Sequence, residues 1–279
     1  MGRGPEEYTF IRGIVLDENK EEMFVNDISQ NKILVYDLSG NYKRDIRHKE
    51  KISYIEIYNY NQDNLICYDE HTFTIISKQD GSITKEIKIP YKDKKTTNVF
   101  VRNNANDIMY AFTLETDYKI IPNQGNFILF EPSSDTLYMY SSNLSMAPLI
   151  VRTPSIQSMH PEVFLFPGII TDRYYFMEIL KKEEKYDRQK GFPYFNLIYD
   201  KQEKAIFEYT VFNNDYSNKR EQNMKLRPLN EEIAFQKLEA IELVEAYKEE
   251  HLKDGKLKEI AATLNEESNP VIMLIKHNR

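Results

Sequence analysis

The sequence contains no tryptophan and a single cysteine, Cys67, among its 279 residues. One cysteine excludes a disulfide within the chain. Cys67 lies in the apolar run 65–68. We therefore interpret it as a small buried side chain and not as a reactive thiol, because no activating base accompanies it.

Long hydrophobic runs are also missing. No apolar stretch approaches the roughly 20 residues that a membrane-spanning helix needs. Residues 1–8 are followed by no apolar segment of the kind found in a signal peptide. The net charge is -7 and the basic residues are scattered, which disfavours a nucleic-acid partner. The sequence thus predicts no transmembrane segment, no signal peptide in this chain and no nucleic-acid binding.

Motifs that carry catalysis or bind cofactors are lacking as well. The sequence has no nucleophile elbow, no phosphate-binding loop and no dinucleotide-binding glycine pattern. Its five histidines show no metal-binding spacing. His71, beside Asp69 and Glu70, is interpreted as a turn residue. We therefore predict no catalytic residues, no metal ligands and no cofactor.

What the sequence does contain is aromatic residues and a repeat. It has 20 Tyr and 15 Phe, which suit the half-buried surface of β-strands. Short apolar runs alternate with Asn, Asp, Ser and Gly turns over residues 23–46, and the pattern returns over 65–89. Gly40 and Gly81 occupy matching turns 41 positions apart. This period is typical of one four-stranded blade of a β-propeller.

Two further copies follow. The third runs from residue 99 to 151, with 114–126 interpreted as an inserted excursion, and the fourth runs from 163 to 211. The predicted antiparallel strands lie near residues 24–25, 33–36, 65–68, 73–76, 108–112, 136–140, 174–180 and 195–199.

The composition changes after Pro228. Residues 230–250 are rich in helix formers, and Asn230 is a candidate N-cap. Leu257, Ile260 and Leu264 fall on one face of a second helical stretch. Residues 271–275 form an apolar run interpreted as a buried strand. We predict a single domain over residues 1–279 with a helical insertion at about 230–264.

Three segments resemble a known family. Residues 23–42 resemble an NHL-type repeat in the order of Val25, Asn26, Asp27, Tyr36 and Gly40. Residues 2–8 and 257–276 resemble parts of a group of bacterial six-bladed β-propeller proteins of unknown function. The resemblance implies an all-β six-bladed-type propeller, here incomplete, with about four blades and a terminal strand.

The resemblance carries further expectations. In that family, a signal or lipoprotein peptide and a first blade precede the segment matched by residues 2–8. Its members are usually exported and lipid-anchored, which implies a place in the cell envelope or periplasm. Without the upstream residues, strand 271–275 would leave an open sheet edge, so we expect this chain to be poorly stable or prone to associate.

Two functions remain open at this point. The first is a non-enzymatic binding or scaffold propeller for a glycan or a protein. Its candidate ligand-binding residues are Arg12, Arg102, Arg152 and Arg173, because guanidinium groups clamp carboxylate or sulfate, although arginine is also common at strand edges.

The alternative is a metal-dependent propeller hydrolase or lyase. It would use a divalent metal held by carboxylates such as Glu7, Asp69 and Asp172. Acidic residues are also expected in turns, and that structural explanation is the simpler one for all three.

Overall fold

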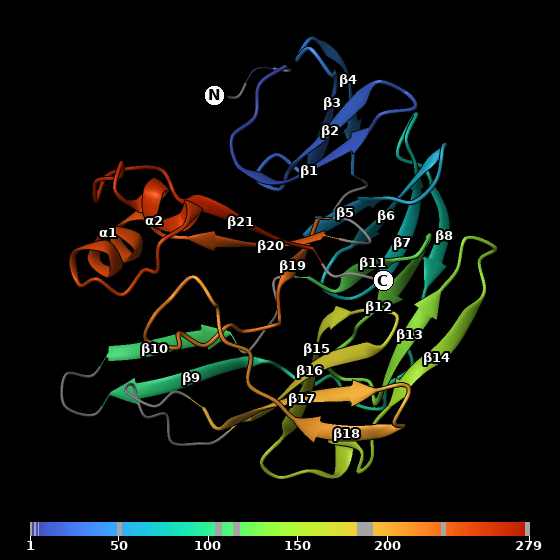
Figure 1. Cartoon of the computed structure of the whole chain (residues 1–279). Helices are drawn as coiled ribbons and strands as arrows, with labels where there is room; N and C mark the ends of the chain where they lie inside the picture. Colours follow the sequence, from blue (N-terminus) through green and yellow to red (C-terminus); the bar gives the residue numbers. More distant parts are fainter. Residues whose placement is uncertain are drawn as a thin grey trace. The chain divides into compact units, whose positions relative to one another are not determined.

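A computed structural model gives the fold, and it describes residues 2, 4, 6–48, 52–103, 108–113, 118–182, 192–229 and 233–276. The chain is nearly all β-strand, which confirms the predicted fold class (Figure 1). It divides into two compact units. Unit 1 comprises Met1–Lys92, Tyr118–Ile121 and Asn126–Val151, and unit 2 comprises Asp93–Asp117, Pro122–Gly125 and Arg152–Arg279. The single-domain expectation stays a prediction.

Unit 1 begins with two four-stranded antiparallel sheets in which each strand pairs with the next along the chain. The first consists of β1 (Ile11–Asp17), β2 (Glu22–Asp27), β3 (Lys32–Asp37) and β4 (Tyr42–Arg47). The second consists of β5 (Glu56–Asn59), β6 (Asn64–Tyr68), β7 (Phe73–Ser77) and β8 (Ile83–Ile87). These two sheets are the two repeats predicted from the sequence.

The third sheet corrects one prediction. It consists of β11 (Ile120–Asn123), β12 (Asn126–Leu129), β13 (Thr136–Tyr140) and β14 (Met146–Val151). Residues 114–126 were expected to be an excursion, yet 120–123 form its first strand, and 114–117 lie outside the described residues. Strand β11 is extended because it pairs with the adjacent β12, so local composition could not identify it as a strand.

The matching turns contain glycine for a physical reason. Gly40 and Gly81 adopt φ values of 88° and 72°, in the left-handed region that glycine enters without steric cost. Each amide donates back into its turn, Gly40 to Asp37 and Gly81 to Ser77. The repeat read from the sequence is thus a repeat of turn conformation.

Two apolar layers hold unit 1 together. Phe24, Ile33 and Val35 of the first sheet pack with Leu65 and Cys67 of the second. A second layer joins the second and third sheets. Cys67 is buried, as predicted, and its burial raises the pKa of the thiol well above the ordinary value. The thiol therefore stays protonated and unreactive.

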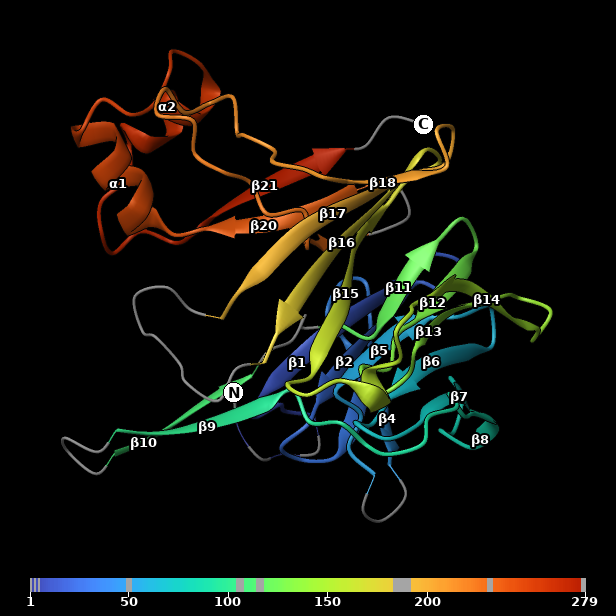
Figure 2. The same cartoon turned by 90° about the horizontal axis from the view of Figure 1, so that it is seen from below.

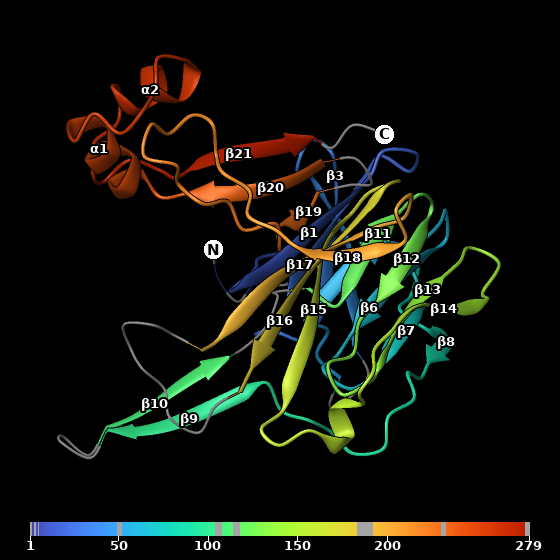
Figure 3. The ribbon, with the colours of Figure 1, turned by 60° about the horizontal axis from the view of Figure 1, so that its bottom comes forward.

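Unit 2 contains an inserted β-hairpin, whereas the sequence predicted the insertion at residues 114–126. Strands β9 (Asn98–Asn103) and β10 (Ile108–Thr113) form a hairpin that pairs only with itself among the described strands. Figure 3 shows this ribbon extending away from the fourth four-stranded sheet. That sheet consists of β15 (Val163–Ile170), β16 (Tyr174–Lys181), β17 (Tyr194–Asp200) and β18 (Ala205–Glu208), and a short 3₁₀ helix (Ile156–Ser158) precedes it.

The end of the chain forms a three-stranded sheet with two helices. The strands are β19 (Arg227–Pro228), β20 (Ile233–Leu238) and β21 (Val271–Lys276). Helices α1 (Ala240–Lys248) and α2 (Lys256–Ala261) lie together beside β20 and β21 (Figure 2). Leu243, Ala246 and Ala261 are buried there, with Leu257 and Leu264 against them. The predicted packing is confirmed for Leu257 and Leu264, although Leu264 follows the end of α2 and is not on the helix itself.

Two expectations for this region were wrong. Residues 233–238 form a strand and not the start of a helix, because pairing with β21 outweighs their helix-forming composition. The helix begins only at Ala240, while the candidate N-cap Asn230 lies outside the described residues. Strand 271–275 exists, but it is not the buried strand predicted, since one face is partly buried and Ile272 and Leu274 on the other are exposed.

Candidate binding surface

Strand β1 presents a row of exposed side chains, which we call the β1 surface: Phe10, Arg12, Ile14 and Leu16. Ile14 is 53% exposed and Leu16 is 55% exposed, whereas Val15 between them and Asp17 after them are buried. Aliphatic side chains left in water at alternate positions of one strand mark a surface that can bind an apolar partner.

Arg12 owes its position to a β-bulge. Ile11 pairs with Asp27 and Gly13 pairs with Asn26, so Arg12 is the extra residue in β1. A bulge redirects the side chain and interrupts the ladder locally, and bulges are frequent beside functional sites. Arg12 is exposed, as are Phe10 and Ile14 on either side of it in the strand.

A buried carboxylate fixes the segment that leads into β1. Asp27 accepts hydrogen bonds from the backbone amides of Thr9 (2.6 Å) and Phe10 (3.3 Å) and from the side chain of Gln30 (2.9 Å). Burial of Asp27 opposes its ionisation, but these donors outweigh it, so its pKa is lowered. The charged carboxylate therefore fixes the backbone on which the β1 surface begins.

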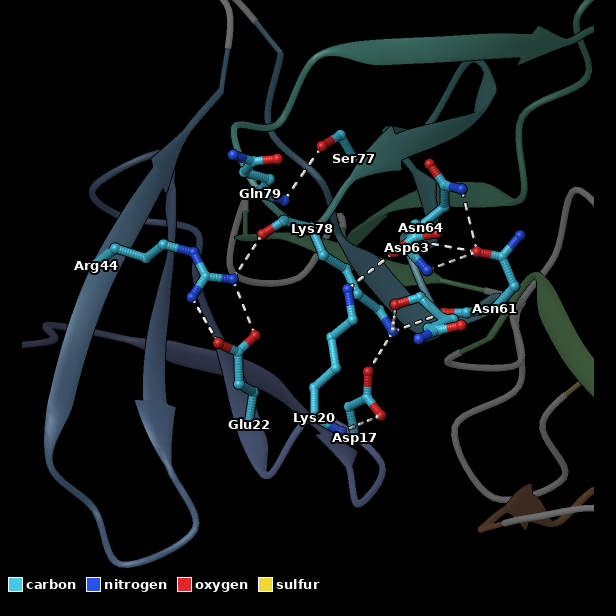
Figure 4. Close-up of polar contacts among 11 residues, drawn as sticks. Asp17, Lys20, Glu22, Arg44, Asn61, Asp63, Asn64, Ser77, Lys78 and Gln79 are labelled. Carbon is cyan, nitrogen blue, oxygen red and sulfur yellow. Dashed lines mark hydrogen bonds and ion pairs between the residues drawn. The ribbon is translucent and has the colours of Figure 1, made fainter.

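The other end of β1 is fixed by an ion pair with the second sheet. The ammonium of Lys78 lies 2.5 Å from Oδ2 of Asp17, the last residue of β1, and both side chains are buried. Lys78 also donates to the backbone carbonyls of Asn61 (2.6 Å) and Gln62 (3.2 Å), so its three donors are all used (Figure 4).

A second ion pair strengthens the same joint. Arg44 binds Glu22 through two hydrogen bonds of 2.6 and 2.9 Å, and it donates a third to the backbone carbonyl of Lys78 (Figure 4). The hydrogen bonds from Arg44 lower the pKa of Glu22 to about 2, although burial opposes this. Glu22 is therefore ionised at neutral pH, and its pair with Arg44 joins β2 to β4 and, through Arg44, to the residue after β7.

The other predicted arginines have different surroundings. Arg152 donates to the backbone carbonyl of Val163 and to the sulfur of Met159, within unit 2. Arg173 binds Oδ2 of Asp200 at 2.7 and 3.0 Å and stacks on the ring of Tyr174. The hydrogen bonds between Arg173 and Asp200 raise the pKa of Arg173 and lower the pKa of Asp200.

Arg102 lies in the hairpin. Its backbone pairs with Met109, and its side chain is outside the described residues. Among the described residues, no two of the four predicted arginines share a binding partner. As ligand-binding residues they stay predictions.

The carboxylates of the enzymatic alternative each accept a hydrogen bond from another residue of the chain. Glu7 accepts from the amide of Gly4, and Asp69 accepts from the amides of His71 and Thr72, which caps the turn before β7. Asp172 accepts from the side chain of Gln124. Across the described ranges, no group of three or more His, Cys, Asp and Glu side chains is placed to hold a metal ion.

The sequence analysis selected Arg12 as a candidate but did not select the exposed residues around it. Ile14 and Leu16 alternate with Val15 and Asp17, and this signal was present in the sequence. The alternation predicts one exposed face, but it does not say which face lacks a covering layer. The partners of Asp17 and Glu22 carried no local signal, because they come from β4 and from the residue after β7.

The repeated four-stranded antiparallel sheets define the chain as a β-propeller. A family model places it more closely: residues 1–234 match the DUF5128 family of 6-bladed beta-propellers, and the chain belongs to this family. No curated protein matches the sequence significantly. None of the helices in the described part of the chain is long and apolar enough to cross a membrane.

The chain is also similar to several solved structures, and the first of them supports the same fold. A Bacteroides fragilis protein inferred to be exported is 16% identical, with a TM-score of 0.64, and the match covers 100% of this chain and 80% of that one. BamB from Moraxella catarrhalis is 10% identical over 70% of this chain and 51% of its own, with a TM-score of 0.41. Virginiamycin B lyase from Staphylococcus aureus is 11% identical over 71% of this chain and 69% of its own, with a TM-score of 0.32.

Proposed function

We propose that this chain is a non-enzymatic binding propeller whose ligand is a protein, and that the β1 surface contacts that ligand. The observation that supports it most is the exposure of Ile14 and Leu16 on the same strand as the exposed Arg12. These side chains project from a strand that Asp27 and Asp17 fix at its two ends. A surface fixed in this way loses little conformational entropy on binding.

The chemistry of the surface favours a protein over a glycan. Sugars are bound by aromatic rings and by several polar donors, whereas Ile14 and Leu16 offer only aliphatic groups. Phe10 is the single aromatic residue of the surface. The partner we propose therefore presents apolar side chains and one carboxylate, which pairs with Arg12 through two parallel hydrogen bonds.

Two further expectations from the sequence remain proposals. The first is that residues 23–42 form an NHL-type repeat. The second is that the protein acts in the cell envelope, in keeping with the structurally similar Bacteroides fragilis protein that is inferred to be exported. Arg102 stays a candidate contact on the hairpin, whereas Arg152 and Arg173 already have internal partners.

Photo-crosslinking tests the proposal. A photoreactive residue replaces Ile14 in one protein and Leu38, an equally exposed side chain in the turn after β3, in a control. After irradiation with an envelope extract, we expect a defined protein adduct from position 14 only. We also expect Arg12→Glu to reduce its yield by about tenfold, the effect of losing a charged hydrogen-bonded contact.

Three outcomes would overturn the proposal. Equal adducts from positions 14 and 38 would show nonspecific contact. Binding to a glycan array that Arg12→Glu abolishes would make the ligand a carbohydrate. Metal-dependent turnover of a substrate would support the hydrolase or lyase alternative.

A further inference from the structure

The chain contains two Asp-Gly dipeptides, Asp80–Gly81 in unit 1 and Asp254–Gly255 in unit 2. In such a dipeptide the backbone nitrogen of the glycine can attack the side-chain carboxyl carbon of the aspartate. Glycine has no side chain to hinder this approach, and its backbone enters conformations that other residues avoid. The surroundings of the two dipeptides differ, so the structure predicts which of them reacts.

The dipeptide Asp80–Gly81 is held in place by its turn. The amide of Gly81 donates to the backbone carbonyl of Ser77 at 2.9 Å. Oδ1 of Asp80 accepts hydrogen bonds from the amide of Ser82 at 3.0 Å and from its hydroxyl at 2.8 Å. A Cβ atom added at Gly81 would lie 2.3 Å from the side chain of Ile46, so the turn is closely packed. The glycine nitrogen and the carboxyl carbon therefore have little freedom to meet.

The dipeptide Asp254–Gly255 has open surroundings. It lies between α1 and α2, and the side chain of Asp254 is 97% exposed. Nothing lies within 4 Å of a Cβ atom built at Gly255. The amide of Gly255 donates no hydrogen bond within the part of the chain that the structure describes. Neither packing nor a competing hydrogen bond therefore opposes the attack.

We propose that Asp254 is a site of spontaneous isomerisation to isoaspartate. The nitrogen of Gly255 bonds to the side-chain carboxyl carbon of Asp254, and the carboxyl hydroxyl leaves as water with the proton of that nitrogen. Water then opens the resulting succinimide ring. When it attacks the backbone carbonyl carbon of Asp254, the chain afterwards runs through the former side chain. One water is lost and one is gained, so the reaction needs no enzyme and no co-reactant.

The neighbouring Lys258 restrains this reaction. Its ammonium lies 2.8 Å from Oδ1 of Asp254. The carboxyl releases a hydroxyl group only when it is protonated. The hydrogen bond from Lys258 lowers the pKa of Asp254, which reduces the protonated fraction. Removing the ammonium group should therefore accelerate the isomerisation.

Isomerisation would lengthen the backbone between two fixed points. On one side, the amide of Lys253 donates to the carbonyl of Asp215 at 2.9 Å. On the other side, the carbonyl of Gly255 accepts the amide of Glu259 at 3.1 Å in the first turn of α2, and Leu257 packs against the helical cluster. The added methylene group must displace the start of α2. We therefore expect the isomerised chain to melt at a lower temperature.

Peptide mapping of the intact chain tests the proposal. The protein is aged in water enriched in oxygen-18 and then digested in ordinary water with a protease that cleaves after glutamate. This digestion releases residues 251–259 and residues 71–86 as separate peptides. We expect peptide 251–259 to gain one oxygen-18 atom and to yield an isoaspartate form that separates on chromatography. Peptide 71–86 is the internal control and should remain unlabelled.

Three variants identify the reacting group and its restraint. Asp254→Glu should abolish the labelling, because its longer side chain would have to close a larger ring, which forms far more slowly. Lys258→Met should raise the rate several-fold. Lys253→Met is the matched control, since the ammonium of Lys253 binds Oδ1 of Asn214 at 2.8 Å and not Asp254, and it should leave the rate unchanged. Equal melting temperatures before ageing establish that the variants are folded.

Four outcomes would overturn parts of this proposal. Absence of label in peptide 251–259, by the time a free synthetic peptide of that sequence has converted completely, overturns the site. Labelling that persists in Asp254→Glu does the same. Equal labelling of the two peptides contradicts the protection of Asp80. Equal rates in Lys258→Met and Lys253→Met contradict the restraint by Lys258.

Discussion

The ammonium of Lys78 lies 2.5 Å from the carboxylate of Asp17, although 61 positions separate the two residues in the sequence. Asp17 ends the first strand of the first sheet, and Lys78 follows the third strand of the second sheet. Removing one partner of a buried pair leaves an uncompensated charge in a medium of low polarity. The joint between the two sheets is therefore sensitive to a single substitution.

Lys78→Met should lower the free energy of unfolding by about 3 to 5 kcal/mol, because it leaves Asp17 buried and unpaired. Lys20→Met is the control: Lys20 pairs with Asp63 on the surface, and such pairs contribute at most about 1 kcal/mol. Urea denaturation measures both. Equal losses in the two variants would show that the Asp17 pair has no special role.

The ion pair of Glu22 predicts a loss of stability in acid. Its pKa is about 2 in the folded protein and 4.5 in the reference state, so folding favours the ionised form. The contribution is complete above about pH 4.5 and is lost as the pH falls toward about 2. The shift corresponds to about 3 kcal/mol. Glu22→Gln should therefore be destabilised at neutral pH but approach the wild type in acid.

Unfolding free energies of wild type and Glu22→Gln, measured between about pH 6 and about pH 3, check this prediction. Asp63→Asn, which alters an exposed carboxylate, should keep the pH dependence of the wild type. A constant difference between wild type and Glu22→Gln across this range would contradict it.

His48 predicts a second pH effect in a milder range. Burial lowers its pKa to about 4 from 6.5, and its ring makes an edge-to-face contact with Tyr54, with the ring centroids 4.6 Å apart. Because the unfolded chain binds the proton first, stability falls as the pH drops from about 6.5 to about 4. His48→Phe keeps the aromatic contact and should remove about 1 to 2 kcal/mol of this pH dependence. Thermal melts at several pH values test it, with His71→Phe in an exposed turn as the control.

The two matching glycines should differ in their tolerance of alanine. Both have positive φ, so Gly40→Ala should cost about 1 kcal/mol of stability from backbone strain alone. At Gly81 the added Cβ would also lie 2.3 Å from Cγ2 of Ile46, which is buried in the core, whereas nothing lies within 4 Å at Gly40. Gly81→Ala should therefore cost at least about twice as much, since overpacking adds to strain. Denaturation midpoints that rank the two variants in the opposite order would refute this.

The strands could be predicted because their signals are local. Turn-forming residues such as Asp37 and Gly40 flank apolar runs, and the predicted strands near 24–25, 33–36, 65–68 and 73–76 all lie within observed strands. The prediction was wrong for residues 233–238, because their composition favours a helix and pairing with β21 makes them extended. The same holds for 120–123, which depend on β12.

The candidate surface was predictable only in part. Arg12 was selected as an arginine beside a predicted strand, yet nothing local showed that a bulge would expose it. The exposure of Ile14 and Leu16 depends on which elements cover the sheet. The contact of Asp17 with Lys78 depends on how two sheets pack, which residue types alone do not encode.

The joint between the second and third sheets has a consequence for how the chain tolerates change. The carboxylate of Glu56 accepts hydrogen bonds from the backbone amides of Lys119 and Ile120. Only the acceptor is a side chain in these two bonds, and every residue except proline has a backbone N–H to donate. The joint can therefore persist when the residues at 119 and 120 change, provided that Glu56 is kept.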